Sequence, residues 1–132
     1  MDWDSLHQEA VAVAANAYAP YSEFTVGAAG LTDRGHLVTG CNVENASYGI
    51  TLCAECGLVS DLRRQGGGRL VAVCIVDGHG GHLAPCGRCR QLLYEHGGPS
   101  LLIHTDDDTL QLEELLPDPF GPGHLRGLGD GG

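Results

Sequence analysis

The sequence contains Cys53-Ala54-Glu55 and, further along, Pro85-Cys86-Gly87-Arg88-Cys89. Three thiols can hold one zinc ion. A structural zinc is normally closed by four protein ligands, whereas three ligands leave a position for water. Glu55 follows the first thiol by two residues, where a carboxylate can exchange protons with that water. The two stretches therefore predict an open zinc site with Cys53, Cys86 and Cys89 as ligands and Glu55 as general acid and base.

Both stretches also open predicted helices. Residues 53–64 have helical composition, and Gly66-Gly67-Gly68 ends this helix. Residues 86–96 follow Pro85 and end at Gly97-Gly98-Pro99. The positive end of a helix stabilises thiolate, the form that zinc binds. We therefore expect two helix N-termini to converge on the metal.

The remaining elements follow from hydrophobic spacing and turn residues. We predict a helix over 4–19 stopped by Pro20, a hairpin of strands 25–31 and 36–41, a buried strand over 69–76 and a strand over 101–103. Residues 110–116 fit a strand, a helical turn or one followed by the other. This order predicts one catalytic domain over 1–120, a three-layer α/β/α fold with a mixed sheet of about five strands. A glycine-rich tail over 121–132 follows, and we expect its end to be mobile.

Charge and cysteine usage narrow the function and the compartment. Acidic residues outnumber basic ones 17 to 7, and the net charge is -10, so we expect no nucleic-acid partner. The N-terminus is acidic and lacks the features of an export signal, and the longest apolar run, 70–76, is too short to span a membrane. We therefore expect a soluble cytoplasmic protein with no membrane partner, in which the cysteines serve metal binding better than disulfides.

Four motifs occur in a specific order. The first motif is Tyr21-Ser22-Glu23-Phe24-Thr25-Val26-Gly27-Ala28. The second is Asn42-Val43-Glu44-Asn45-Ala46-Ser47-Tyr48-Gly49, which leads into the third, Thr51-Leu52-Cys53-Ala54-Glu55. The fourth is Pro85-Cys86-Gly87-Arg88-Cys89-Arg90-Gln91. Up to Phe120 the chain closely resembles the small homotetrameric cytidine deaminases, whose zinc signature it carries. The resemblance implies hydrolytic deamination of cytidine and deoxycytidine to uridine and deoxyuridine in pyrimidine salvage, with one Zn²⁺ per subunit of a homotetramer.

The resemblance also assigns roles outside the metal motif. It implies that Asn42 and Glu44 bind the ribose hydroxyls, that Phe24 packs on the pyrimidine, that Ala54 approaches the base through its backbone N–H, and that Ala46, Tyr48 and Phe120 contact a neighbouring subunit's site.

One residue departs from the family pattern. The family often carries arginine directly after the catalytic glutamate, where it offsets thiolate charge, but this chain has Cys56. Without that cation the zinc is more electron-rich unless helix ends, solvent, Arg88 or Arg90 compensate. Cys56 also lies one helical turn from Cys53, so a closed site of four thiolates is an alternative.

Other interpretations stay open at this point. Within deamination, the substrate could be a nucleoside-like antibiotic such as blasticidin S or, against the charge balance, a polynucleotide. From another class, the thiols could form a structural zinc in an interaction module, or Cys86 and Cys89 a redox pair. His79 and His82 are a second possible metal pair, and residues 106–108 are a solvated acidic turn or, more remotely, a cation site.

Overall fold

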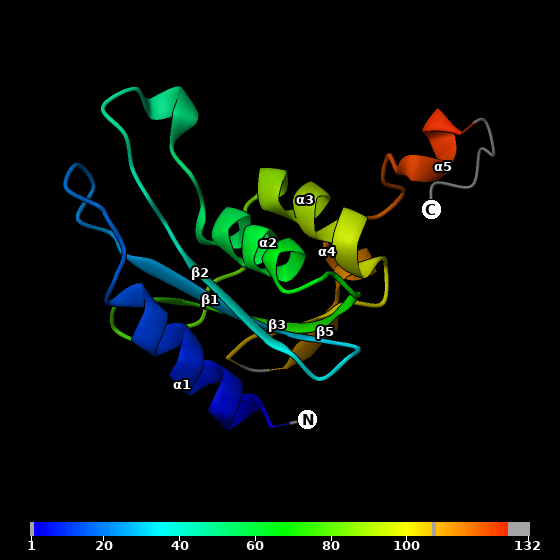
Figure 1. Cartoon of the computed structure of the whole chain (residues 1–132), viewed down its shortest axis with the longest axis horizontal. Coiled ribbons are helices and arrows are strands. Elements are labelled where there is room, and N and C mark those ends of the chain that lie inside the picture. The colour runs from blue at the N-terminus through cyan, green and yellow to red at the C-terminus, as the bar shows by residue number, and fades with distance from the viewer. Residues whose placement is uncertain (1, 107, 127–132) are drawn as a thin grey trace.

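The computed structural model describes residues 2–106 and 108–126, which form a five-stranded sheet with helices on both faces (Figure 1). The elements are α1 (Trp3–Ala14), β1 (Val26–Thr32), β2 (Leu37–Cys41), η1 (Tyr48–Ile50), α2 (Ala54–Arg64), β3 (Leu70–Asp77), α3 (Gly87–Gly97), β4 (Leu102–His104), β5 (Thr109–Gln111), α4 (Leu112–Leu115) and α5 (Pro122–Leu125). The strand order is β2-β1-β3-β4-β5, and β3 and β4 are parallel while the other neighbours are antiparallel. The predicted mixed sheet and the hairpin of its first two strands are confirmed.

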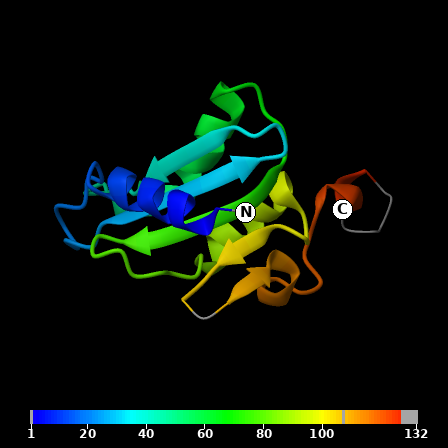
Figure 2. The same cartoon turned by 90° about the horizontal axis from the view of Figure 1, so that it is seen from below.

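Helix α1 covers one face of the sheet, and α2 and α3 cover the other (Figures 1 and 2). Successive strand residues point to opposite faces, so each strand serves both cores. In β1, Ala28 belongs to the core beneath α2 and α3, and Ala29 to the core beneath α1. In β3, Ile75 lies in the core beneath α2 and α3, and Cys74 in the core beneath α1. Burial raises the pKa of the Cys74 thiol to about 11. The predicted three-layer α/β/α architecture is confirmed, with Cys74 as a small buried hydrophobe.

The first helix is shorter than predicted, because α1 ends at Ala14 and not at residue 19. Beyond it the chain pairs with a distant segment: Tyr18 forms a bridge with Val43, and its backbone N–H donates to the Asn42 carbonyl at 3.0 Å. This tertiary pairing replaces the last helical turn that the alanine-rich sequence favours.

The C-terminal region resolves the alternatives for residues 110–116. A short strand, β5, passes directly into one helical turn, α4, whose Leu112 is fully buried. Beyond them α5 occupies part of the predicted glycine-rich tail, while residues 127–132, where we expected mobility, lie outside the described residues. Of the helices in the described ranges, none combines the length and apolar character needed to cross a membrane.

Helix α2 lies unusually close to strand β2. A Cβ atom added to Gly40 would stand 2.3 Å from both the Ala54 carbonyl oxygen and the Leu58 nitrogen. At the other end of the helix, the Asp61 carboxylate accepts a hydrogen bond from the Thr39 backbone N–H at 2.9 Å. The glycine and the carboxylate together set the position of α2, and therefore of its N-terminus, on the sheet.

We predict that Gly40→Ala lowers the free energy of unfolding by about 3 kcal/mol, because helix backbone must move to admit one methyl group. Urea denaturation measures this change. Gly49→Ala is the matched control, since a Cβ at that position meets nothing within 4 Å. Equal stability of the two variants would contradict the close approach of α2 to β2.

Candidate metal centre and active site

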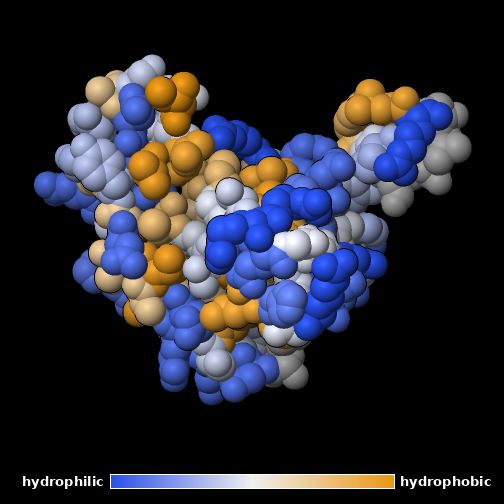
Figure 3. Space-filling view, viewed as in Figure 1, coloured by the Kyte–Doolittle hydropathy of each residue, from blue (hydrophilic) through white to orange (hydrophobic). Residues whose placement is uncertain are grey.

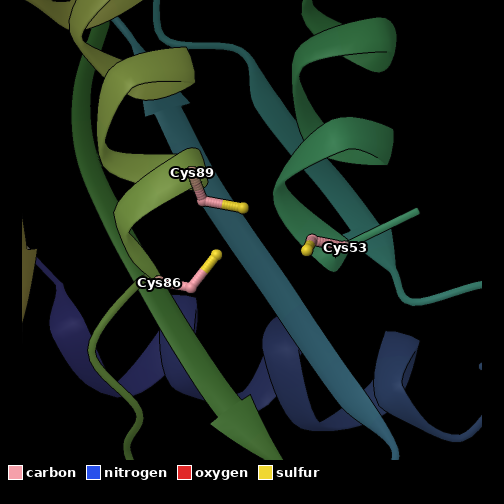
Figure 4. Close-up of side chains that lie close together, drawn as sticks. All are labelled: Cys53, Cys86 and Cys89. Carbon is pink, nitrogen blue, oxygen red and sulfur yellow. The ribbon is translucent and has the colours of Figure 1, made fainter. Parts of the chain in front are cut away.

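Three thiols meet where α2 and α3 begin. Cys53 is the N-cap residue of α2, Cys86 is the N-cap residue of α3, and Cys89 lies in the first turn of α3. Their Sγ atoms all lie within 4.8 Å of one another (Figure 4). The structure thus brings together the three predicted metal ligands from segments that are far apart in the sequence.

The helix ends leave these thiols free to face one another. Cys53 and Cys86 both have extended backbones. The first N–H groups of a helix lack intrahelical partners and carry partial positive charge. Two such ends point toward the thiols, which favours the thiolate form that a metal requires.

The proton affinities of the thiols differ with their surroundings. Burial raises the pKa of Cys89, and the negative charge of Glu55 adds to this effect. Burial also raises the pKa of Cys53. Burial acts to raise the pKa of Cys86 as well, but hydrogen bonds from the Cys89 backbone N–H and from the neighbouring thiols outweigh it, and the pKa falls. Three thiolates this close are therefore unfavourable unless a cation binds among them.

The donor set fits zinc. A tetrahedral zinc with Zn–S bonds of about 2.3 Å keeps its sulfurs about 3.8 Å apart, within the spread found here. The cluster in the described part of the chain does not include Cys56. The Cys56 Sγ instead accepts a hydrogen bond from the Arg88 guanidinium at 3.4 Å. The structure therefore favours three sulfur ligands over the closed four-thiolate alternative.

Glu55 is a buried carboxylate beside the thiols. Glu55 is only 4 % exposed, and burial raises the pKa of its carboxyl group above the usual range. It lines a pocket of about 220 Å³ together with Cys53 and Cys86. A carboxyl group with a raised pKa in a small pocket is suited to take up and return protons.

The same pocket has apolar walls and one amide. Its lining residues are Val26, Asn42, Thr51, Leu52, Cys53, Ala54, Glu55, Ile75, Leu83, Ala84 and Cys86. The Asn42 side chain accepts from the Val26 N–H at 2.8 Å and donates to the Phe24 carbonyl at 2.9 Å, which holds it against the end of β1. A larger cavity of about 450 Å³ lies by the C-terminal end of α3, and no predicted site residue lines it.

A second pocket, of about 340 Å³, adjoins the first through Thr51, which lines both. Glu44 lies in this second pocket with Tyr21, Ser22 and Tyr48. Its carboxylate accepts from the Tyr21 and Ser22 backbone N–H groups at 3.0 and 3.1 Å and from the Ser22 hydroxyl. The Ser22 hydroxyl bond lowers the pKa of Glu44 and keeps it ionised.

Sequence reasoning did not single out Ser22 and Thr51. Ser22 orients Glu44, and Thr51 joins the two pockets. Both residues lie inside the family motifs quoted above, and that position was the one feature of the sequence that could have pointed to them. No periodicity or spacing distinguishes a serine that orients a carboxylate from any other loop serine.

Two predicted aromatic contacts lie away from the pockets within this chain. Phe24 is 51 % exposed and lines neither pocket. Phe120 lies on the C-terminal arm just before α5, and Figure 1 shows that arm on the opposite side of the molecule from the loop of residues 48–50. Ala46 and Tyr48 lie in the exposed loop that carries η1. One chain alone therefore does not bring all the predicted contacts together.

The two histidines of the alternative metal pair have other contacts. The His82 ring packs on the rings of His7 and His104, with ring centroids 5.0 and 4.7 Å away. The backbone N–H of His79 donates to Asp77 in a local turn. Among the described residues, the cluster suited to a metal ion is the one formed by the three thiols.

Comparison with known proteins agrees with this geometry. Residues 1–105 match the family model described as the cytidine and deoxycytidylate deaminase zinc-binding region. A cytidine deaminase of Mycobacterium tuberculosis is 60% identical over 121 residues, which cover 92% of this chain and 91% of the relative.

Solved structures give the same result. The crystal structure of the M. tuberculosis cytidine deaminase has a TM-score of 0.90 at 60% identity and covers 92% of this chain and 98% of its own. The cytidine deaminase of Mycobacterium leprae has a TM-score of 0.88 at 60% identity, covering 89% and 99%. With the trithiol cluster and the buried carboxylate at the start of α2, these matches show that the chain belongs to the cytidine deaminase family of zinc-dependent hydrolases.

Proposed function

We propose that this protein removes the exocyclic amine of cytidine and deoxycytidine by hydrolysis, giving uridine or deoxyuridine and ammonia. The observation that carries the proposal is the buried Glu55 carboxyl group, which shares a small pocket with thiols suited to zinc. The identity to cytidine deaminases over nearly the whole chain supports the same activity.

Glu55 moves the protons of the reaction. Zinc held by Cys53, Cys86 and Cys89 would supply a Lewis acid that makes water ionise near neutral pH. Glu55 takes a proton from the attacking water and delivers it to N3 of the ring as oxygen bonds to C4. The same carboxyl group then takes the second proton of that oxygen and passes it to the amine, which leaves as ammonia. Its raised pKa suits both the uptake and the release of a proton.

The two pockets divide the substrate. The apolar walls near Val26 and Leu83 fit a pyrimidine ring, and the first N–H of α2, at Ala54, is available to the base. Asn42 and Glu44 present an amide and a carboxylate for the ribose hydroxyls. Phe24 does not line the first pocket, but its carbonyl accepts from the Asn42 amide that does, and its exposed ring would pack on the bound base.

The charge of the second pocket favours nucleosides over nucleotides. The family model covers both cytidine and deoxycytidylate deaminases. The residues that line the second pocket include the ionised Glu44 and no arginine, and the whole chain carries a net charge of -10. A phosphate group at the sugar end would be repelled.

The exposed apolar surface supports a homotetramer. Tyr48 and Ile50 on the η1 loop are 77% and 62% exposed, and Phe120 and Leu125 on the arm are 57% and 81% exposed. Figure 3 shows hydrophobic side chains on both protruding segments. Apolar side chains gathered on protruding segments are typical of surfaces that another chain covers. Ala46, Tyr48 and Phe120 would then complete the pockets of neighbouring subunits. We place the enzyme in the cytoplasm, in pyrimidine salvage.

A substrate panel tests the activity. We expect ammonia from cytidine and deoxycytidine, much less from deoxycytidylate, and none from cytosine or blasticidin S, which lack the ribose that Asn42 and Glu44 would bind. Removal of zinc by a chelator should stop turnover, and added zinc should restore it. Preference for blasticidin S would support the antibiotic deaminase, and an unchanged ultraviolet spectrum with cytidine would support an interaction module.

Glu55→Gln should lower kcat for cytidine by about a thousandfold while zinc content and fold are retained, because the amide cannot carry protons. Glu113→Gln, an exposed acid on α4, is the control and should keep wild-type turnover. Steady-state kinetics and metal analysis give both quantities. Near-normal turnover by Glu55→Gln would refute the assigned role.

A mixing experiment tests the shared sites. Phe120→Ala should lower activity by removing a residue from the neighbouring site, and Glu55→Gln should inactivate its own. Mixed tetramers should regain activity, because an inactive Glu55→Gln subunit still donates Phe120. Analytical ultracentrifugation should show a tetramer. A monomer, or no recovery after subunit exchange, would contradict the shared site.

A further inference from the structure

The trithiolate site carries an uncompensated charge. Three thiolates and one divalent ion sum to one negative charge, and the ionised form of Glu55 adds another nearby. We propose that Arg88 neutralises this excess, and that Cys56 is its anchor across the gap between the two helices rather than a metal ligand. The inference rests on the zinc site of the proposed function.

The position of Arg88 supports this role. It is the second residue of α3, between Cys86 and Cys89 in the sequence, and its guanidinium reaches Cys56 in the first turn of α2 at 3.4 Å. The side chain therefore bridges the two helix starts that bear the thiols. Cys56 itself lies outside the sulfur cluster, which leaves its thiol free to accept this hydrogen bond.

The helix dipole makes this position costly for a cation. Positive side chains in the first turn face the positive end of the helix and are disfavoured there. Arg88 is nevertheless held in the first turn of α3 and directed toward sulfur. Attraction to the sulfurs accounts for a side chain that the helix alone would not favour.

Arg90, the other arginine of this turn, has a different task. Its guanidinium donates to the Pro85 carbonyl at 2.8 Å and to the Leu115 carbonyl at 3.0 Å, so it connects the segment before α3 with the end of α4. Further away, Arg64 pairs with Asp61, and Arg69 donates to Gly97. Within residues 2–106 and 108–126, the arginine with a hydrogen bond to a thiol is Arg88.

The test measures zinc affinity rather than turnover alone. In competition with a chromophoric chelator, Arg88→Gln should raise the zinc dissociation constant about tenfold, the lower end of what ligand-supporting residues contribute, since Arg88 is exposed to solvent. In the cobalt-substituted protein, its loss should shift the sulfur-to-metal charge-transfer band. Arg88→Lys should retain most of the affinity because it keeps the charge. Arg34→Gln, an exposed arginine in the turn between β1 and β2, is the matched control and should bind zinc as the wild type does.

A double-mutant cycle separates the anchor from the charge. Cys56→Ala should weaken zinc binding by less than Arg88→Gln, because the guanidinium stays but is no longer held. In the Arg88→Gln background, Cys56→Ala should add almost nothing. Complete loss of zinc in Cys56→Ala alone would make Cys56 a ligand and overturn the assignment. So would wild-type affinity in Arg88→Gln, or an Arg88→Lys variant as weak as Arg88→Gln.

Wild-type behaviour distinguishes the two proposals. If the wild-type protein binds zinc and releases ammonia from cytidine while Arg88→Gln has normal affinity and an unshifted cobalt spectrum, only the role of Arg88 fails. If the wild-type protein binds zinc but releases no ammonia, the proposed function fails and the role of Arg88 is judged by the affinities. If the wild-type protein binds no zinc, both fail.

Discussion

The meeting of two helix N-termini over one sheet is the constraint on which this site depends. Cys53 stands at the start of α2, and Cys86 and Cys89 at the start of α3, so the thiols converge only if both helices are held in place. The close approach at Gly40 positions α2, and burial of Leu93 in the core positions α3. A small shift of either helix would separate the sulfurs, because each is carried by backbone near a helix end.

Burial decides the chemistry of the groups that meet there. The interior raises the pKa values of Cys53, Cys89 and Glu55, which makes the thiols depend on a cation and suits the carboxyl group to the proton transfers proposed for it. One location therefore prepares both the metal ligands and the acid. The cost is a concentration of negative charge, and the exposed Arg88 lies at its edge. The buried thiols and Glu55 thus lie next to an exposed arginine that, in the proposal above, balances their charge.

Next to the thiols, two adjoining pockets share Thr51 as a lining residue. The first pocket is the smaller and lies next to the thiols, and the second contains the Glu44 carboxylate, held by Ser22. Residues expected to complete these pockets lie on segments that protrude from the chain, the η1 loop and the C-terminal arm (Figure 3). Catalysis and assembly are coupled under the proposed function, since Tyr48 and Phe120 remain largely exposed within their own chain.

Local patterns of the chain predict the three thiols and Glu55 as site residues and the order of the main elements, because thiol spacing, glycine stops and apolar periodicity depend on neighbouring residues alone. Family resemblance adds the prediction that Asn42 and Glu44 bind the sugar. Features that depend on distant partners became visible only in the tertiary structure. Tyr18 pairs with the segment after β2, so α1 ends early. Residues 109–115 form a strand followed by a helical turn. The Cys56 thiol accepts a hydrogen bond from Arg88 and lies outside the thiol cluster. Each of these outcomes depends on contacts between residues far apart in sequence, and no local pattern encodes such contacts.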